Sequence, residues 1–392
     1  MISEILALVE KHENWRGKEC LNLIPSENVM SPAVRGLLGS ELVHRYTARD
    51  HFYMGTRFMD EIEQFGEELA KEVFGAETAD LRPLSGHVAD MIFVACFSKP
   101  GDVLMCVSPD DGGYSGLWHD GLAGLFGLRA VPLPFLKDDM NIDVGKAEET
   151  IRRVKPKLVI FGASLITFPH PVKELADIAN EVGACVGFDG SHVLGLIAGK
   201  HFQDPLREGA QVLLGSTHKS FFGPQGGIVL ADKEHGEVMK AKICPRFVDN
   251  AHWNRIAALT LALAEMREFG REYAEQVIRN AKALAKNLYD YDFPVKCSHL
   301  GFTQSHQVIL DFGGYERARE IAEKLQRANI IVDCVIRLGT CEVTRRGMKE
   351  GEMAKIAELI KRAVLDEENP ETIKREVAKL CSEFQSIQYC FK

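Results

Sequence analysis

The segment GSTHKSFFGPQGG, residues 215–227, contains the residues best suited to covalent chemistry with a cofactor. Lys219 follows the hydroxyl-bearing residue Ser216 and precedes a turn at Gly223 and Pro224. A lysine at a strand-to-turn junction can lose its proton and form an imine with an aldehyde cofactor. A lysine in a turn is more often a solvated surface charge, so the neighbouring motifs decide between the two interpretations.

Two upstream motifs favour the chemical interpretation. Asp189 ends the apolar run in GFDGSHVLGL, where a buried carboxylate needs a cation such as a pyridinium nitrogen, although a strand-end Asp more commonly caps a helix. Ser85, Gly86 and His87 in PLSGHVAD begin a helix, and free backbone N–H groups there favour a phosphate, although Ser85 could be a plain N-cap. The order phosphate site, ring-nitrogen Asp and imine-forming Lys predicts a pyridoxal-phosphate site.

The segments around these motifs predict the elements that position them. Between about residues 58 and 235, segments of helical period alternate with apolar segments typical of strands, which indicates an α/β domain with a largely parallel sheet. Ligands in such folds bind at the carboxyl ends of the strands, where Asp189, Ser164 and Lys219 are expected. The expected helices are 58–75, 85–97 and 171–183, and the expected strands are 102–108, 157–164, 184–190 and 212–218.

The first of these helices, 58–75, has an apolar stripe at helical spacing and a glycine at its end. The stripe consists of Phe58, Ile62, Phe65, Leu69 and Val73.

A second region follows a long expected helix at 253–289. It contains an expected strand at 305–312, a helix at 315–329, a strand at 341–347 and two charged amphipathic helices in the last forty or so residues. This pattern predicts a smaller α+β domain. We therefore expect an N-terminal arm at 1–30, a large cofactor-binding domain at 31–250, and a linking helix with the smaller domain at 251–392.

The composition excludes several classes of protein. The chain has 392 residues, 46% of them apolar, and a formal net charge of -9, which argues against a nucleic-acid partner. Its apolar runs are far shorter than the about 20 residues that cross a membrane. The N-terminus carries acids and has no cleavage site typical of a signal peptide, which predicts a cytoplasmic protein. The ten cysteines form no CxxC pair or Cys/His cluster, so neither a disulfide framework nor a metal site is expected.

Four blocks of the sequence resemble the serine hydroxymethyltransferase family, whose members are fold-type-I pyridoxal-phosphate enzymes. The resemblance runs in register from about residue 20 to 350. It implies a large domain with a mostly parallel central sheet and a smaller C-terminal α+β domain. The blocks are LNLIPSENVMSPAVRGLLGSELVHRY, FDGSHVLGLIAG, STHKSFFGPQGG and VIRLGTCEVTRRG.

The resemblance assigns roles around the cofactor. It implies that Lys219 forms the Schiff base and that Asp189 binds the pyridine nitrogen. Tyr114 takes the place of a histidine that stacks on the ring, and an aromatic ring can stack there equally well. His218 is expected to support the ring or the turn. The remaining residues expected to contact the cofactor are Ser85, Gly86, His87, Ser164, His192 and Ser216, with His192 and Ser164 at the phenolic oxygen or the substrate.

The resemblance also assigns residues to the substrate. Arg337 matches the arginine that binds the substrate carboxylate, and Glu27 matches a glutamate that moves protons. Tyr46 and Tyr53 match tyrosines that enter the neighbouring subunit's site, which implies a homodimer with a shared active site. Three structural alternatives remain open: Glu27 caps a helix, Arg337 pairs with Asp333 or Glu342, and Tyr53 packs in an interface.

Several segments depart from the family's pattern. The family's Gln-Gly-Gly-Pro stretch, which reaches the partner's phosphate, is replaced by CPRFVDNAHWNRIA, and we expect Arg246, His252 or Asn254 to take over that contact. Gln225 replaces the usual arginine after the lysine turn. The loop before Arg337 is cut to NIIVDCV, and the segment between the two tyrosines is shortened to TARDHF. Both deletions reduce the expected contacts to a folate.

These observations predict an enzyme that cleaves or forms the Cα–Cβ bond of a β-hydroxy amino acid with pyridoxal phosphate. Serine and glycine with a tetrahydropterin carrier are the first candidates. A pterin-independent threonine-type aldolase or transaldolase is the alternative, followed by an aminotransferase and a non-catalytic cofactor-binding protein.

Overall fold

The computed structural model describes residues 2–47 and 52–392, and the chain divides into two compact units. We call residues 30–274 with 390–392 the sheet unit, and residues 1–29 with 275–389 the terminal unit. Helix α10 (Trp253–Asp290) begins in the first and ends in the second. None of the helices in the described part of the chain is long and apolar enough to span a membrane.

The sheet unit is built on a seven-stranded sheet in the order β2-β10-β9-β8-β7-β3-β4. The strands from β9 to β4 are parallel, whereas β10 is antiparallel to both of its neighbours. The expected largely parallel sheet is therefore confirmed. The strands are β2 (Thr78–Asp80), β3 (Val103–Cys106), β4 (Arg129–Pro132), β7 (Leu158–Phe161), β8 (Cys185–Asp189), β9 (Val212–Ser216) and β10 (Gly227–Ala231), and a hairpin joins β5 (Phe135–Leu136) to β6 (Asn141–Ile142).

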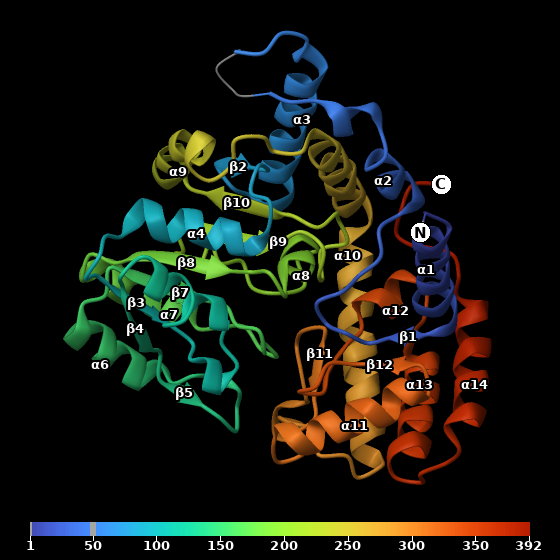
Figure 1. Ribbon diagram of the computed structural model, residues 1–392. Helices are drawn as coiled ribbons and strands as arrows, with labels where there is room; N and C mark the ends of the chain where they lie inside the picture. The colour runs from blue at the N-terminus through green and yellow to red at the C-terminus, as the bar shows by residue number, and fades with distance from the viewer. Residues whose placement is uncertain (1, 48–51) are drawn as a thin grey trace. The chain divides into compact units, whose positions relative to one another are not determined.

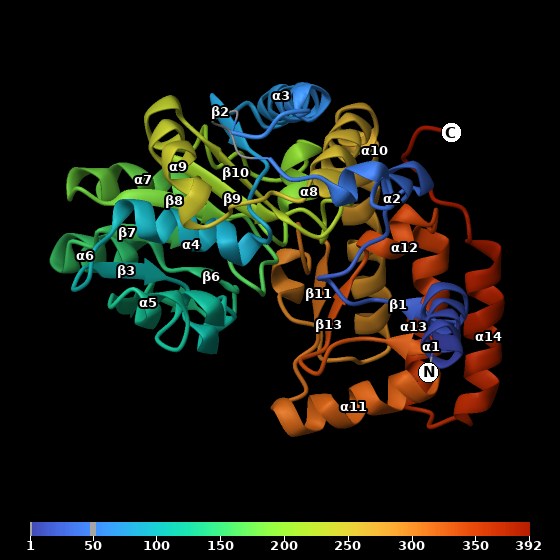
Figure 2. The same cartoon turned by 45° about the horizontal axis from the view of Figure 1, so that its top comes forward.

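Strands β7 to β10 are buried at every position, which explains why they read as continuous apolar runs rather than alternating ones. Helix α4 (Gly86–Phe97) lies across β8 and β9 on one face of the sheet (Figures 1 and 2). The other helices of the unit are α2 (Pro32–Leu37), α3 (Arg57–Phe74), α5 (Leu122–Leu125), α6 (Val144–Val154), α7 (Val172–Glu181), α8 (Leu194–Ala198) and α9 (Lys233–Arg246).

Helix α3 forms where its periodicity predicts and ends at Gly75, whose φ of 69° closes the last turn. Only part of the apolar stripe is buried, because Phe58 and Phe65 are 67% and 61% exposed. The buried face is instead centred near Gly66, where an added Cβ would lie 2.4 Å from the Thr260 hydroxyl of α10. This close approach between helices decides which face is buried.

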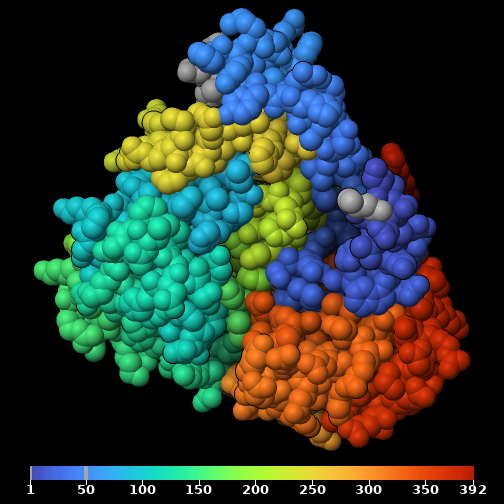
Figure 3. Space-filling model, in the orientation of Figure 1, coloured from blue at the N-terminus to red at the C-terminus, as the bar shows by residue number. Residues whose placement is uncertain are grey.

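The terminal unit combines the two ends of the chain. β1 (Leu21–Asn22) pairs in parallel with β12 (Ile330–Ile331), and β11 (Gln307–Ile309) pairs antiparallel with β13 (Arg337–Gly339). In the space-filling view the C-terminal helices appear in orange and red as a closely packed surface (Figure 3). The helices are α1 (Ile2–Asn14), α11 (Tyr315–Arg327), α12 (Cys341–Arg345), α13 (Glu350–Val364) and α14 (Pro370–Glu383), and a short π-helix (Trp15–Glu19) follows α1.

The expected strand at 341–347 is wrong, since these residues form helix α12. Every residue of α12 is buried, and its polar side chains bond to other segments. The Thr344 hydroxyl donates to the Thr340 carbonyl at 2.6 Å and accepts from Asn280 Nδ2 at 2.8 Å, while Arg345 Nη1 donates to the Gln388 carbonyl at 2.6 Å. Partners distant in sequence override the strand preference of Val343 and Thr344.

Candidate active site

The turn that carries Lys219 follows the end of β9 and is tied down on both sides. Thr217 Oγ1 donates to the Pro224 carbonyl at 2.7 Å, and Ser220 Oγ accepts from the Gly195 N–H at 3.0 Å. Both hydroxyl residues are fully buried. The lysine backbone is therefore held in place rather than displayed on a loose surface turn, which supports the chemical interpretation.

Two histidines flank this lysine. Lys219 Nζ lies 3.5 Å from Nε2 of His192, a side chain that is only 5% exposed. Burial, with a smaller contribution from the Lys219 charge, lowers the pKa of His218 to about 4. His218 is consequently neutral at physiological pH, which fits a supporting role beside the turn.

Asp189 is the last residue of β8 and is 9% exposed. Its Oδ1 accepts a hydrogen bond from the Ser191 N–H at 2.9 Å, and within residues 2–47 and 52–392 it forms no ion pair. A buried carboxylate without a cation in the protein fits a cationic ligand atom such as a protonated ring nitrogen. Ser164 comes three residues after the end of the adjacent parallel strand β7, so it lies just beyond a carboxyl strand end, as Asp189 and Lys219 lie at or beyond theirs.

The N-terminus of α4 lies against the same strand ends. Ser85 caps the helix, with Oγ accepting from the Val88 N–H at 3.1 Å, so the plain-cap alternative is present. An added Cβ on Gly86 would lie 2.3 Å from Ser216 Oγ and 2.9 Å from Ser191 Oγ. The first turn of α4 therefore approaches β9 as closely as atoms allow, and its free N–H groups are available for an anion.

Tyr114 and His87 contact each other beside this turn. Tyr114 Oη lies 3.2 Å from His87 Nδ1, and the two rings meet edge to face with centroids 5.9 Å apart. Burial, then the charges of Asp90 and Asp189, raise the pKa of Tyr114 to about 12. An added Cβ on Gly116 would lie 2.4 Å from the Tyr114 ring, so the glycine makes room for it.

Arg337 and Glu27 belong to the terminal unit, and both are engaged there. Arg337 Nε donates to Asp333 Oδ2 at 2.7 Å, which is one of the alternatives weighed from the sequence. Glu27 Oε2 accepts from Arg16 Nη2 at 2.6 Å, an ion pair that the sequence did not suggest. Glu27 does not cap α2, because Ser31 has that role.

Tyr46 and Tyr53 lie at the surface of the sheet unit, 43% and 38% exposed. Their ring centroids are 5.1 Å apart, and Phe52, which is 74% exposed, packs edge to face on Tyr53. Tyr46 also bonds to Asp249. Most of the shortened segment between the tyrosines, residues 48–51, lies outside the described residues.

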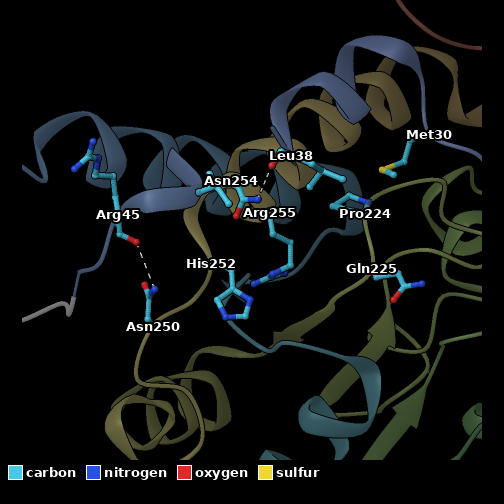
Figure 4. Close-up of a pocket in the computed structure, with 10 residues that line it drawn as sticks. Met30, Leu38, Arg45, Pro224, Gln225, Asn250, His252, Asn254 and Arg255 are labelled. Atoms are coloured by element: carbon cyan, nitrogen blue, oxygen red, sulfur yellow. Dashed lines mark hydrogen bonds between the residues drawn. The ribbon is translucent and has the colours of Figure 1, made fainter. Parts of the chain in front are cut away.

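A cavity of about 660 Å³ lies beside the lysine turn in the same unit (Figure 4). His252, Asn254 and Gln225 line it, whereas Arg246 is not among its lining residues. Asn254 Nδ2 donates to the Leu38 carbonyl at 2.8 Å. The full lining is Met30, Leu38, Val43, Arg45, Pro224, Gln225, Asn250, His252, Asn254 and Arg255.

Sequence reasoning missed several buried polar residues around the site. Arg255 is 6% exposed and donates through Nη2 to the Leu81 carbonyl at 2.7 Å, and burial lowers its pKa to about 10. Asp90 is 1% exposed and Ser191 is 5% exposed. Asp90 had a signal, since it is the single charged residue in the apolar segment GHVADMIFVACF. No three His, Cys, Asp or Glu side chains in the described ranges are placed to hold a metal ion.

Comparison with known proteins gives a consistent result. Residues 2–360 match the family model described as serine hydroxymethyltransferase. The serine hydroxymethyltransferase of Methanocaldococcus jannaschii is 45% identical, over 98% of this chain and 94% of that protein, and that of Thermococcus kodakarensis is 42% identical, over 99% and 95%. The crystal structure of L-threonine transaldolase from Pseudomonas fluorescens superposes with a TM-score of 0.93 at 28% identity, covering 100% of this chain and 93% of that chain.

Proposed function

Because this chain belongs to the serine hydroxymethyltransferase family, a family of pyridoxal-phosphate enzymes, we propose that it transfers a hydroxymethyl group between serine and glycine, using a tetrahydropterin as the one-carbon carrier. The observation that carries the proposal is the match to serine hydroxymethyltransferases over almost the entire chain at 42–45% identity. The buried Asp189 beside the anchored lysine turn supports it.

Pyridoxal phosphate, when bound, supplies an electron sink for the charge that develops at Cα of the amino acid. In the proposed site Lys219 would hold the cofactor through its amine, Asp189 would bind the ring nitrogen and Tyr114 would stack on the ring. His192 lies beside the lysine amine. The phosphate is assigned to the start of α4 and to Ser216, through Ser85, Gly86 and His87.

The decisive test of the cofactor assignment is reductive trapping. Borohydride treatment of the protein with pyridoxal phosphate is expected to attach the cofactor to Lys219, as located by peptide mass spectrometry. The variant Lys219→Arg keeps the charge but cannot form the imine, so the adduct should disappear. Lys200→Arg is the matched control, because Lys200 is another lysine of the sheet unit and is not among the residues assigned to the cofactor. An adduct on any other lysine contradicts the assignment.

Arg337 is proposed to bind the substrate carboxylate, since its planar guanidinium can make two parallel hydrogen bonds. Asp333, which accepts from Arg337 Nε, orients the side chain in this arrangement. Arg337→Lys is expected to raise KM for serine by about tenfold or more, equivalent to about 1.4 kcal/mol, with a smaller effect on kcat. An unchanged KM would leave Arg337 as a structural partner of Asp333.

The role of Glu27 requires a separate test, because its carboxylate already accepts from Arg16. If Glu27 carries the proton, Glu27→Gln should lower kcat by about 100-fold and leave the melting temperature unchanged. Loss of stability with kcat retained would instead assign Glu27 to the ion pair that joins the π-helix to the following segment. Measuring kcat and thermal unfolding on the same preparation separates the two roles.

A pterin-independent transaldolase or aldolase is the second candidate. It is favoured by the likeness to L-threonine transaldolase and by the short segment NIIVDCV before Arg337. Release of aldehyde from threonine or allo-threonine without any pterin would support it. Conversion of serine to glycine that depends strictly on tetrahydrofolate or tetrahydromethanopterin supports the first proposal and excludes the second.

We also propose that the protein acts as a homodimer with a shared active site. Tyr46, Phe52 and Tyr53 form an exposed aromatic cluster, and such patches commonly mark protein interfaces. The expected mass in light scattering is that of two chains. Replacement of Phe52 by Ser should weaken the dimer, and a monomeric, fully active wild-type protein would contradict the proposal.

A further inference from the structure

Asp90 is a carboxyl group that the proposed reaction does not use. Its side chain is 1% exposed, and neither carboxyl oxygen has a hydrogen-bond partner in the described part of the chain. An ionised carboxylate in such a place lacks both water and donors, which is costly in free energy. A residue of this kind in helix α4, directly beside the predicted cofactor site, therefore needs an explanation.

The packing register of α4 places Asp90 opposite Asp189. An added Cβ on Gly86 would lie 2.9 Å from Ser191 Oγ. An added Cβ on Gly187 would lie 2.8 Å from the Phe93 ring. Asp90 is four residues after Gly86 and three before Phe93, so it lies on the same helix face between the two contacts.

On the sheet side, Asp189 lies between these two contacts as well. It is two residues beyond Gly187 in β8, so both residues present the same face of the strand to α4. The helix crosses β8 and β9 in both ribbon views (Figures 1 and 2). The two buried carboxyl groups thus come from different elements and are close enough for their charges to interact.

We propose that Asp90 is a positioning residue that carries a proton, so that the pair holds a single negative charge on Asp189, where the ring nitrogen of the cofactor binds. Only the binding of the cofactor's ring nitrogen at Asp189 rests on the proposed function. Two carboxyl groups in a dry site do not both ionise. Asp189 has a backbone donor in the Ser191 N–H, whereas Asp90 has no donor, so the charge settles on Asp189.

The charged and titratable groups around Asp90 agree with this assignment. Burial, then the charge of Asp189, raise the pKa of Asp90 well above its usual range, and the Lys219 charge opposes them. Burial raises the pKa of both Cys106 and Tyr114 to about 12, with a smaller contribution from Asp90, so both stay neutral.

A protonated Asp90 has one O–H donor to offer. Donation to one oxygen of Asp189 fixes the orientation of that carboxylate and leaves its other oxygen for the ring nitrogen. Ionisation of Asp90 would add a second negative charge and remove the donor. Asparagine keeps a neutral donor of the same shape, whereas leucine keeps the volume but has no donor.

The protonation state can be measured without the cofactor. In an infrared difference spectrum, wild type minus Asp90→Asn, we expect the carbonyl band of a neutral carboxylic acid at neutral pH, with a shift in D₂O. Asp80→Asn is the matched control, because Asp80 is also buried but accepts a hydrogen bond from Arg82 Nη2 at 2.6 Å and should show carboxylate bands. Carboxylate bands from Asp90 at neutral pH would overturn the inference.

The positioning role is tested with pyridoxal phosphate bound. Asp90→Asn should retain the wild-type affinity for the cofactor and the pH of its visible-absorbance transition. Asp90→Leu should shift that transition by about one pH unit or more and weaken cofactor binding by about tenfold, with an unchanged or higher melting temperature. Equal behaviour of the two variants would overturn the positioning role.

Failure of the proposed function gives a different pattern. A protein that binds pyridoxal phosphate but converts no amino acid contradicts the function and leaves both measurements on Asp90 interpretable. A carboxylate at Asp90 in an active enzyme contradicts the inference alone.

Discussion

At the scale of single residues, the buried carboxyl groups of Asp189 and Asp90 differ in the hydrogen-bond donors around them. Asp189 receives the Ser191 N–H, and Asp90 receives nothing from the described residues. For Asp90 this environment makes stability depend on pH, because a carboxyl that is neutral in the folded protein still ionises in the unfolded chain.

The first prediction concerns the stability of Asp90→Asn. The raised pKa means that the unfolded chain loses this proton near 3.8 while the folded protein keeps it, so Asp90 lowers stability as pH rises above about 4. The free energy of unfolding of the variant should match that of wild type near pH 4. As pH rises, the variant should become more stable than wild type by up to about 1.4 kcal/mol per pH unit, until Asp90 ionises in the folded state. Urea unfolding of the cofactor-free protein at several pH values measures this difference.

Asp143 is the control for the sign of that effect. The Lys146 N–H, which Asp143 caps, lowers the pKa of Asp143. Its stabilising contribution is therefore present above the unfolded pKa and is lost as pH falls, so Asp143→Asn should lose stability relative to wild type at neutral pH. If the unfolding free energies of Asp90→Asn and wild type change with pH in parallel, the pKa of Asp90 is not raised in the folded protein.

At the scale of elements, the contact of α4 with β9 positions the start of the helix for an anion. Gly86 is required at this contact, because a side chain there would meet Ser216 Oγ at 2.3 Å and the Ser216 N at 3.0 Å. The helix start would have to move away from the strand end, and its free N–H groups would move with it.

The second prediction follows from this contact. Gly86→Ala should destabilise the protein by about 1–3 kcal/mol and weaken cofactor binding. Gly36→Ala is the control, since Gly36 lies in α2 with nothing within 4 Å of an added Cβ, and alanine there should stabilise by up to about 1 kcal/mol. Chemical unfolding and cofactor titration measure the two effects, and equal stability of both variants would argue against the tight contact.

At the scale of the whole molecule, the terminal unit is assembled from segments some 300 residues apart. Leu21 pairs with Ile330, and Trp15 Nε1 donates to Asn329 Oδ1 at 3.0 Å. Asn22 Nδ2 donates to Glu342 Oε1 at 3.0 Å, which links β1 to α12. The N-terminal segment is therefore part of a core that also contains the last helices.

The third prediction tests that core. Leu21 is 1% exposed, so Leu21→Ala should cost about 2–5 kcal/mol of unfolding free energy. Leu300→Ala serves as the control, because Leu300 is 45% exposed in the same unit and its loss should change stability by less than about 0.5 kcal/mol. Similar losses for the two variants in urea unfolding would show that β1 does not belong to the core.

The sequence alone determined the features that depend on local pattern. Continuous apolar runs marked β7, β8 and β9, and helical periodicity marked α7. Asp189 at a strand end and Lys219 just beyond one indicated the cofactor chemistry. These features are local because the order of apolar and polar residues along a short segment indicates whether both faces of a strand, or one face of a helix, are buried.

The tertiary structure decided what depends on partners distant in sequence. It turned 341–345 into a helix through Asn280 and Gln388, chose the buried face of α3 through Thr260, and paired Glu27 with Arg16. It also placed Asp90 near enough to Asp189 for their charges to interact, whereas the sequence showed only a single charged residue in an apolar helix. Such contacts join segments whose spacing along the chain carries no periodic signal, and only the packing of one element on another specifies them.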